Sequence, residues 1–158
     1  MSHPVEHSDG LAKLQDRVHD DLMSLCLPAK PWLPPQSFAG QPLYDVAVVG
    51  AGMSGMALSA ALTHLGIGVH LIDRAPAGFE GPWATTARME TLRSPKELTG
   101  PALGIPSLTF RSWYVAQFGI EAWSNLDKIP RLMWADYLRW YRSVLDIQVH
   151  NRQQLQSI

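Results

Sequence analysis

This sequence has little cysteine, a small net charge and no long hydrophobic run, and each of these features excludes a class of protein. Cys26 is the single cysteine, so an intramolecular disulfide cannot form. The formal net charge is −1 and charged residues make up 17%, which provides no electrostatic attraction for nucleic acid or acidic membranes. No apolar run approaches the roughly 18 residues that span a bilayer, and the polar start is unlike a secretory signal. We therefore expect a cytoplasmic protein without a membrane span.

Signatures of metal binding and of catalysis are missing as well. No Cys, His or carboxylate residues have the spacing of metal ligands, and His3, His7 and His19 are interpreted as surface residues. H-E-x-x-H, G-x-S-x-G and P-loop motifs do not occur. The sequence thus predicts no metal site and identifies no catalytic residue.

A pattern of strand, glycine loop, helix and strand occupies residues 44–74. Asp45–Val49 is apolar and rich in valine, which is typical of a buried parallel strand. It continues into a G-x-G-x-x-G loop and then into Met53–Leu65, whose composition favours a helix. Gly66 occupies the position of a C-cap glycine, and Ile67–Asp73 is a second apolar strand. This is a βαβ unit, so we expect an α/β, Rossmann-like fold. The alternative is a glycine-rich turn in an ordinary α/β protein.

Each polar or small residue of this pattern has a separate expected role at a dinucleotide. Gly50 permits the tight turn, Gly52 leaves room for the pyrophosphate, and Gly55 lets the helix pack closely on the sheet. The helix N-terminus offers free N–H groups to the phosphates. Asp73 is placed to accept hydrogen bonds from an adenosine ribose and to repel a 2′-phosphate, which favours FAD or NAD over NADP at this site. Arg74 beside it weakens that preference.

Two segments are expected, residues 1–43 and residues 44–158. In the first, apolar residues at helical spacing predict an amphipathic helix with Asp9 or Ser8 as N-cap, with Cys26 as a small buried group and with its own domain as packing partner. The stripe comprises Leu11, Leu14, Val18, Leu22 and Leu25. Five prolines between positions 28 and 42 predict an extended connector.

The part of the chain after Asp73 begins with a long segment that has neither helical nor strand periodicity. Ala84–Leu108 is expected to be a functional loop, in which Arg88, Arg93 and Lys96 are candidates to face phosphate, flavin or nicotinamide. Helical segments follow, interrupted at Gly119 and ending with a helix over residues 131–145, and residues 147–150 are then expected to begin a strand. A complete doubly wound sheet needs more parallel strands. We therefore expect an incomplete FAD-binding domain, the N-terminal fragment of a longer protein.

Several segments resemble the class B flavoprotein monooxygenases, which include flavin-containing and Baeyer–Villiger monooxygenases. The resemblance starts with the fingerprint at residues 50–73 and continues through Gly81-Pro82-Trp83 and through segments 87–101, 108–119, 134–145 and 147–151. It implies FAD in a first fold and NADPH in a second one, with hydride passing from NADPH to FAD before a small organic substrate is oxygenated. The Asn that flavin-containing monooxygenases carry near residues 92–96 is absent, and no second G-x-G-x-x-G occurs. The NADPH domain is therefore expected to lie outside this chain.

These observations lead to one hypothesis and two alternatives. The hypothesis is the FAD-binding portion of an NAD(P)H-dependent flavin oxidoreductase or monooxygenase, inactive on its own. The alternatives are a truncated dinucleotide-binding module without turnover and an NAD-dependent dehydrogenase. The predicted cofactor contacts are Gly50, Gly52, Ser54, Gly55, Asp73, Arg74 and Trp83.

Overall fold

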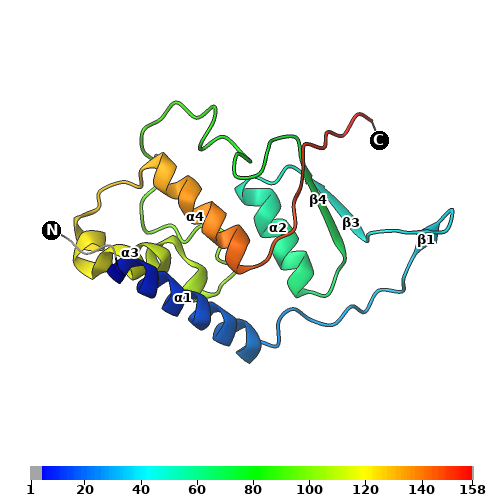
Figure 1. The fold of residues 1–158 in the computed structure, drawn as a ribbon, viewed down its shortest axis with the longest axis horizontal. Coiled ribbons are helices and arrows are strands. Elements are labelled where there is room, and N and C mark those ends of the chain that lie inside the picture. Colours follow the sequence, from blue (N-terminus) through cyan, green and yellow to red (C-terminus); the bar gives the residue numbers. More distant parts are fainter. Residues whose placement is uncertain (1–4, 158) are drawn as a thin grey trace.

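The structure, a computed structural model, describes residues 5–157, with side chains from residue 9 onward. Its elements are α1 (Val5–Ser24), β1 (Ser37–Phe38), β2 (Gln41–Pro42), β3 (Val46–Val49), α2 (Met53–His64), β4 (Val69–Asp73), the short 3-10 helix η1 (Pro106–Leu108), α3 (Phe110–Asn125), α4 (Arg131–Val144) and β5 (His150–Asn151) (Figure 1). This order confirms the predicted α/β fold class: a βαβ unit, a long loop, a helical segment and a further strand, all preceded by a helix.

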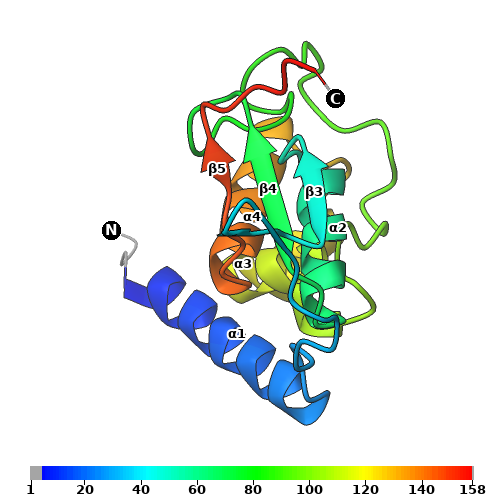
Figure 2. The same ribbon diagram turned by 90° about the vertical axis from the view of Figure 1, so that its right-hand side faces the viewer.

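A parallel sheet of three strands, in the order β3–β4–β5, organises the molecule. Val46 pairs with Val69, and Ile72 pairs with His150. Parallel neighbours need crossover connections; α2 lies in the first, and the long loop with α3 and α4 forms the second. These helices cover one face of the sheet, as Figure 2 shows. The carboxyl ends of all three strands consequently meet at one edge.

The end of α2 is set by its glycine. Gly66 has a positive φ of 75°. Its N–H donates to the Thr63 carbonyl at 2.9 Å, and the Ile67 N–H donates to the Leu62 carbonyl at 3.0 Å. This is the hydrogen-bond pattern of a Schellman motif, and it confirms the predicted role of Gly66. The same glycine lies against the connector, because a Cβ there would be 2.4 Å from the Lys30 carbonyl oxygen.

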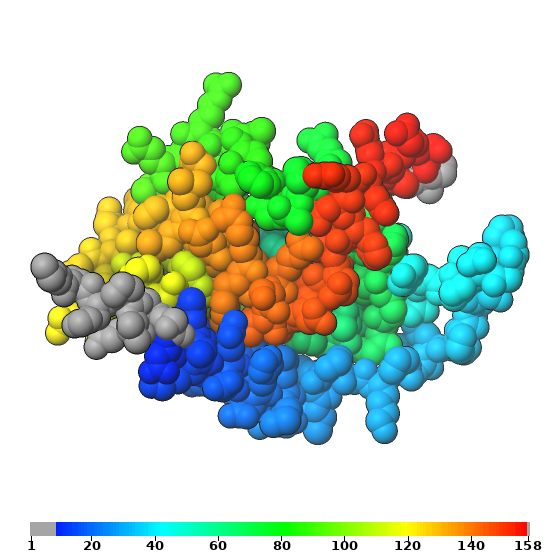
Figure 3. Space-filling model, in the orientation of Figure 1, coloured from blue at the N-terminus to red at the C-terminus, as the bar shows by residue number. Residues whose placement is uncertain are grey.

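Helix α1 packs along α3 and forms one edge of the body (Figure 3). Leu14 and Val18 are buried in the common core, so the helix packs on its own chain. A Cβ on Gly10 would lie 1.9 Å from the Ala116 carbonyl oxygen, which shows how closely the two helices approach. Two details of the prediction were wrong. The helix begins before the proposed N-caps Ser8 and Asp9, and Cys26 lies beyond its end as an exposed residue.

An aromatic core joins α3 to α4. Phe110 and Tyr137 are fully buried and meet edge to face with ring centroids 5.4 Å apart, an arrangement that aromatic rings prefer. The Tyr137 hydroxyl donates to the Leu108 carbonyl at 2.7 Å, and burial raises its pKa far above the ordinary value. Gly119 interrupts α3 with non-helical backbone angles, at the predicted position.

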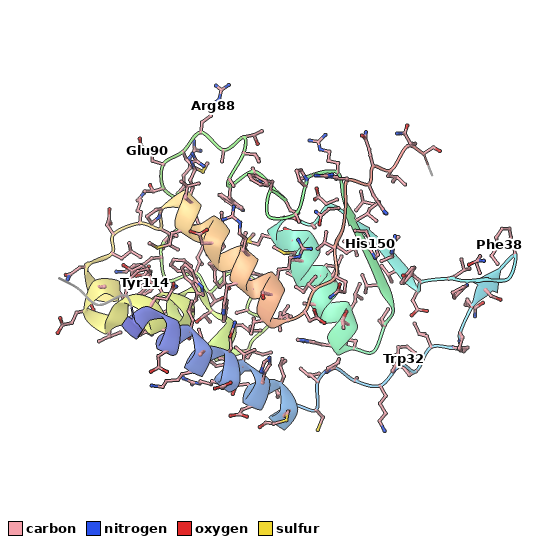
Figure 4. The ribbon with its side chains drawn as sticks, in the orientation of Figure 1. Trp32, Phe38, Arg88, Glu90, Tyr114 and His150 are labelled. Atoms are coloured by element: carbon pink, nitrogen blue, oxygen red, sulfur yellow. The ribbon has the colours of Figure 1, made fainter. Side chains whose placement is uncertain are left out.

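The second face of the sheet carries a row of three rings, those of Tyr44, His70 and His150. His70 stacks on Tyr44 with centroids 4.6 Å apart and lies 4.3 Å from the ring of His150. Val49 on the same sheet is 58% exposed. The β1–β2 hairpin projects beyond this side, with Phe38 near its tip (Figure 4).

The histidine pair makes stability depend on pH. Partial burial and the neighbouring His150 both lower the pKa of His70. As pH falls through about 6.5 the unfolded chain takes up the proton first, so the folded state loses stability as the solution becomes more acidic than this. A His70→Phe variant should therefore show a smaller drop in unfolding midpoint between pH 8 and pH 5.5 than the parent chain. His19→Gln, on the exposed side of α1, is the matched control; equal drops in all three proteins would contradict the expectation.

In the part of the chain that the structure describes, no helix combines the length and apolar character needed to cross a bilayer. The same residues contain no cluster of three or more His, Cys, Asp or Glu side chains arranged to hold a metal ion.

Candidate functional site

The glycine loop lies at the carboxyl edge of the sheet, between β3 and α2 (Figure 1). Gly50 has a φ of 98°, a conformation that glycine adopts without steric cost. Its N–H donates to the Ile72 carbonyl at 2.8 Å, so the chain turns out of β3 while staying attached to β4. The crevice outside the carboxyl ends of parallel strands is where open α/β sheets bind ligands.

The contact between α2 and this loop requires glycine at position 55. A Cβ on Gly55 would lie 1.8 Å from the Gly50 carbonyl oxygen and 3.6 Å from Cγ1 of Val48. No side chain fits at 1.8 Å from a main-chain oxygen. The helix can begin directly above the strand only because this residue lacks a Cβ.

Two glycines from different loops face each other at the start of α2. A Cβ on Gly52 would lie 3.6 Å from Cα of Gly81, and a Cβ on Gly81 would lie 3.3 Å from Cα of Gly52. Gly81 also has a positive φ of 72°. The main chains of the glycine loop and of the loop after β4 therefore come together with no side chain between them.

The N-terminus of α2 is free to receive an anion. Its N-cap residue is Gly52, no side chain caps the helix, and no acidic residue occurs in the first turn. The first N–H groups of a helix lack intrahelical partners and carry partial positive charge. Ser54 lies exposed in this turn. The arrangement suits a phosphate group.

Asp73 lies at the end of β4 with only 8% of its surface exposed. Its Oδ2 accepts the Ala51 N–H at 2.7 Å and its Oδ1 accepts the Ala75 N–H at 2.7 Å. The carboxylate thus braces the glycine loop from inside the crevice. Each carboxylate oxygen has a second lone pair, so these bonds leave acceptor capacity for a ligand hydroxyl. Arg74, the next residue, is exposed.

A cavity of about 580 Å³ opens beside the first turn of α2. Met53 and Ser54 form one wall, the long loop forms a second wall, and Trp134 of α4 contributes an aromatic surface. Trp83 joins this group and meets Trp134 edge to face, with ring centroids 6.4 Å apart. The size and the apolar, aromatic lining are typical of sites for flat organic ligands.

The long loop that bounds the cavity is irregular but anchored. Thr91 forms an isolated bridge with Pro130. The Arg131 guanidinium donates to the Trp83 carbonyl at 2.6 Å. The Lys96 ammonium donates to the carbonyls of Trp123, Ser124 and Leu126 at the end of α3, where a cation complements the helix dipole. The cavity wall is therefore held in place by the helices around it.

Comparison with known proteins identifies the family. Residues 47–158 match the model of the FAD-NAD(P)-binding family. The chain belongs to this family. It is also 48% identical over 149 residues to an FAD-dependent urate hydroxylase from Xanthomonas campestris pv. campestris (strain ATCC 33913), an alignment that covers 94% of this chain and 32% of the relative. The chain thus spans about a third of the length of that curated relative. No solved structure matches this chain at a significant level.

In this FAD-NAD(P)-binding chain, most of the predicted contacts gather at one edge of the sheet. The three fingerprint glycines and Asp73 surround the start of α2, and Ser54 and Trp83 line the adjoining cavity. Arg74 is exposed beside them. Their role as cofactor contacts remains a prediction, but the geometry brings them together as a binding site requires.

The three basic residues that the sequence placed in the functional loop have separate positions. Arg93 lines the cavity, whereas Arg88 is exposed and points away from the body in Figure 4. The Lys96 ammonium donates hydrogen bonds to carbonyls at the end of α3. Of the three, Arg93 is the one placed at the candidate site.

Sequence reasoning missed two groups of residues. One consists of Glu80, Arg142 and Asn151, which connect the loop after β4 to α4 and β5. The other is the anchor that Lys96 makes on α3. A single acid within an apolar, glycine-rich loop was a signal for the first group, but its partners have no fixed spacing in the chain.

Proposed function

We propose that this chain forms the FAD-binding region of a flavin-dependent hydroxylase that uses NAD(P)H and acts on a small organic substrate. The observation that carries the proposal is the uncapped N-terminus of α2, which faces the Gly52–Gly81 contact beside the cavity. The 48% identity to an FAD-dependent urate hydroxylase supports the same assignment. Because that relative is named for urate, flat heteroaromatic compounds are the substrate class to test first.

The residues present fit FAD in a definite order along the crevice. Asp73 is placed to accept hydrogen bonds from the adenosine ribose. The amides at the start of α2 bind the diphosphate, and the Gly52–Gly81 contact leaves it room because neither residue has a side chain. The apolar cavity beside Ser54 and Trp83 takes the flavin end of the molecule. Bound FAD supplies hydride acceptance and oxygen activation, while the protein binds and orients it.

The ionisable groups of the cavity lining bear on whether this chain catalyses by itself. Arg93 is the one ionisable residue among the described residues that line the cavity, and an arginine does not release its proton near neutral pH. No side chain there can act as general acid or base. This observation also favours the second candidate function, a dinucleotide-binding module without turnover.

Flavin binding tests the proposal directly. The purified 158-residue chain should quench the fluorescence of added FAD, and should unfold at higher temperature in its presence. At a concentration 100 times the Kd, the ligand should stabilise the chain by about 2.7 kcal/mol. Stabilisation by NAD without any response to FAD would instead indicate a nicotinamide-binding protein. If the FAD-loaded chain oxidised NADPH, the alternative of a dinucleotide-binding module without turnover would be excluded.

A further inference from the structure

Glu80 is a buried acid in the loop that follows β4. Its side chain is 8% exposed. Its Oε1 accepts from Nη1 of Arg142 at 2.6 Å and from Nδ2 of Asn151 at 2.6 Å, and its Oε2 accepts the Gly78 N–H at 2.8 Å. The carboxylate is therefore held by three donors from three parts of the chain. So complete a set of partners for one buried charge fixes its position within a narrow range.

The donors connect this loop to the second crossover of the fold. Arg142 belongs to the last turn of α4, and its side chain is 25% exposed. Asn151 belongs to β5, and its Nδ2 donates to the Ala75 carbonyl at 3.0 Å as well as to Glu80. The start of the loop is thus tied to β5, and its middle is tied to both α4 and β5. Glu80, Arg142 and Asn151 are called the clamp below.

The clamp acts directly beside the candidate cofactor site. Glu80 precedes Gly81, whose main chain lies against Gly52 at the start of α2. On the other side of Gly81, the Trp83 carbonyl accepts from Arg131 at 2.6 Å. Gly81 therefore lies between two anchored positions of the loop. Glu80 is bound by Arg142 of α4 and Asn151 of β5, and the Trp83 carbonyl is bound by Arg131 of α4. Gly81 itself has a positive φ of 72°. Glycine adopts this conformation without steric cost, so the backbone of Gly81 does little by itself to fix the position of the loop.

We propose that Glu80, Arg142 and Asn151 are positioning residues that hold Gly81 against Gly52 and so set the width of the crevice that receives the diphosphate. This inference rests on the proposed function and adds to it three residues that do not touch the cofactor. The clamp determines how well a dinucleotide that crosses the Gly52–Gly81 contact is bound. A ligand that ends at its first phosphate is bound mainly by Asp73 and α2, and depends on the clamp much less.

The test compares the affinities of FAD and AMP for clamp variants of the whole 158-residue chain. Arg142→Met removes the charge and keeps the aliphatic stem. Asn151→Ala removes the hydrogen bonds of the amide to Glu80, to the Ala75 carbonyl and to Arg142, and leaves the ion pair between Glu80 and Arg142. Asp9→Asn is the matched control, because it breaks an exposed ion pair with Lys13 within α1 and leaves the loop and its partners unchanged. Each Kd is measured below the unfolding transition of that variant, as followed by circular dichroism.

We expect the Kd for FAD to rise at least tenfold in Arg142→Met and several-fold in Asn151→Ala. The Kd for AMP should change less than threefold in both variants, and the control should match the parent chain. The double variant should lose less than the product of the two single losses, since both side chains act through Glu80. If the binding of FAD and the binding of AMP were weakened equally, the clamp would have only a general structural role and the inference would be overturned. Unchanged FAD binding would overturn it as well. A parent chain that binds no FAD would instead count against the proposed function.

Discussion

Replacing Gly55 by alanine should destabilise the chain by roughly 3 kcal/mol and should abolish FAD binding, because the new methyl group has no space. Its carbon would lie 1.8 Å from the Gly50 carbonyl oxygen. The obstacle is main chain rather than a flexible side chain, so either α2 moves away from β3 or the loop changes shape. Urea unfolding followed by circular dichroism measures the first effect, and FAD titration measures the second.

Gly52→Ala is the informative comparison, since it adds the same methyl group three residues earlier. The new carbon would be 3.6 Å from Cα of Gly81, an ordinary contact, and the residue has a negative φ of −66°. The folded chain should therefore keep nearly all of its stability. FAD binding should still weaken at least tenfold, because the methyl group enters the space assigned to the diphosphate. If the two variants had the same unfolding midpoint, the structural account of Gly55 would be wrong.

Asp73→Ala is the second change with a large expected effect. It removes the acceptor for two main-chain N–H groups, those of the fully buried Ala51 and of Ala75. A buried donor that loses a charged acceptor costs roughly 1.5–3 kcal/mol. The glycine loop should loosen, and the predicted ribose contact disappears with it. We expect a lower urea midpoint together with the loss of measurable FAD binding.

Asp45→Ala provides the control for this variant at the opposite end of the sheet. Asp45 also accepts a main-chain N–H, that of Gly68 at 2.7 Å, but this bond is exposed to solvent. Water can replace the lost acceptor there, so the variant should lose little stability. It should bind FAD like the parent chain. Parallel losses of FAD binding in both variants would show that Asp73 has no special place in the site.

The fold near the glycine loop could be predicted because its signals are local. The valines of β3, the glycines at 50, 52 and 55, and the capping glycine at position 66 each act on their immediate neighbours in the chain. The structure places β3, α2 and β4 within two residues of the predicted limits. The start of α1 could not be predicted in this way, because Ser8 and Asp9, residue types that commonly cap a helix, lie within the helix and not before it.

The same distinction between local and distant interactions applies to the candidate site. Its glycines and Asp73 could be identified from the sequence, because a phosphate-binding turn needs those residue types in that order. The cavity wall could not be identified, since an irregular loop takes its shape from distant anchors. Lys96 reaches carbonyls 27 to 30 residues away.

What the sequence by itself determined is the βαβ unit and the chemistry expected at its first turn, because backbone preferences and residue spacing act within a few residues. Only the tertiary structure decided which side chains hold that turn in place. Glu80 meets Arg142 and Asn151 across 62 and 71 residues. Contacts over such separations depend on how the second crossover returns to the sheet. No periodicity in the chain records that return, so the clamp follows from the pairing of β5 with β4 and not from any sequence spacing.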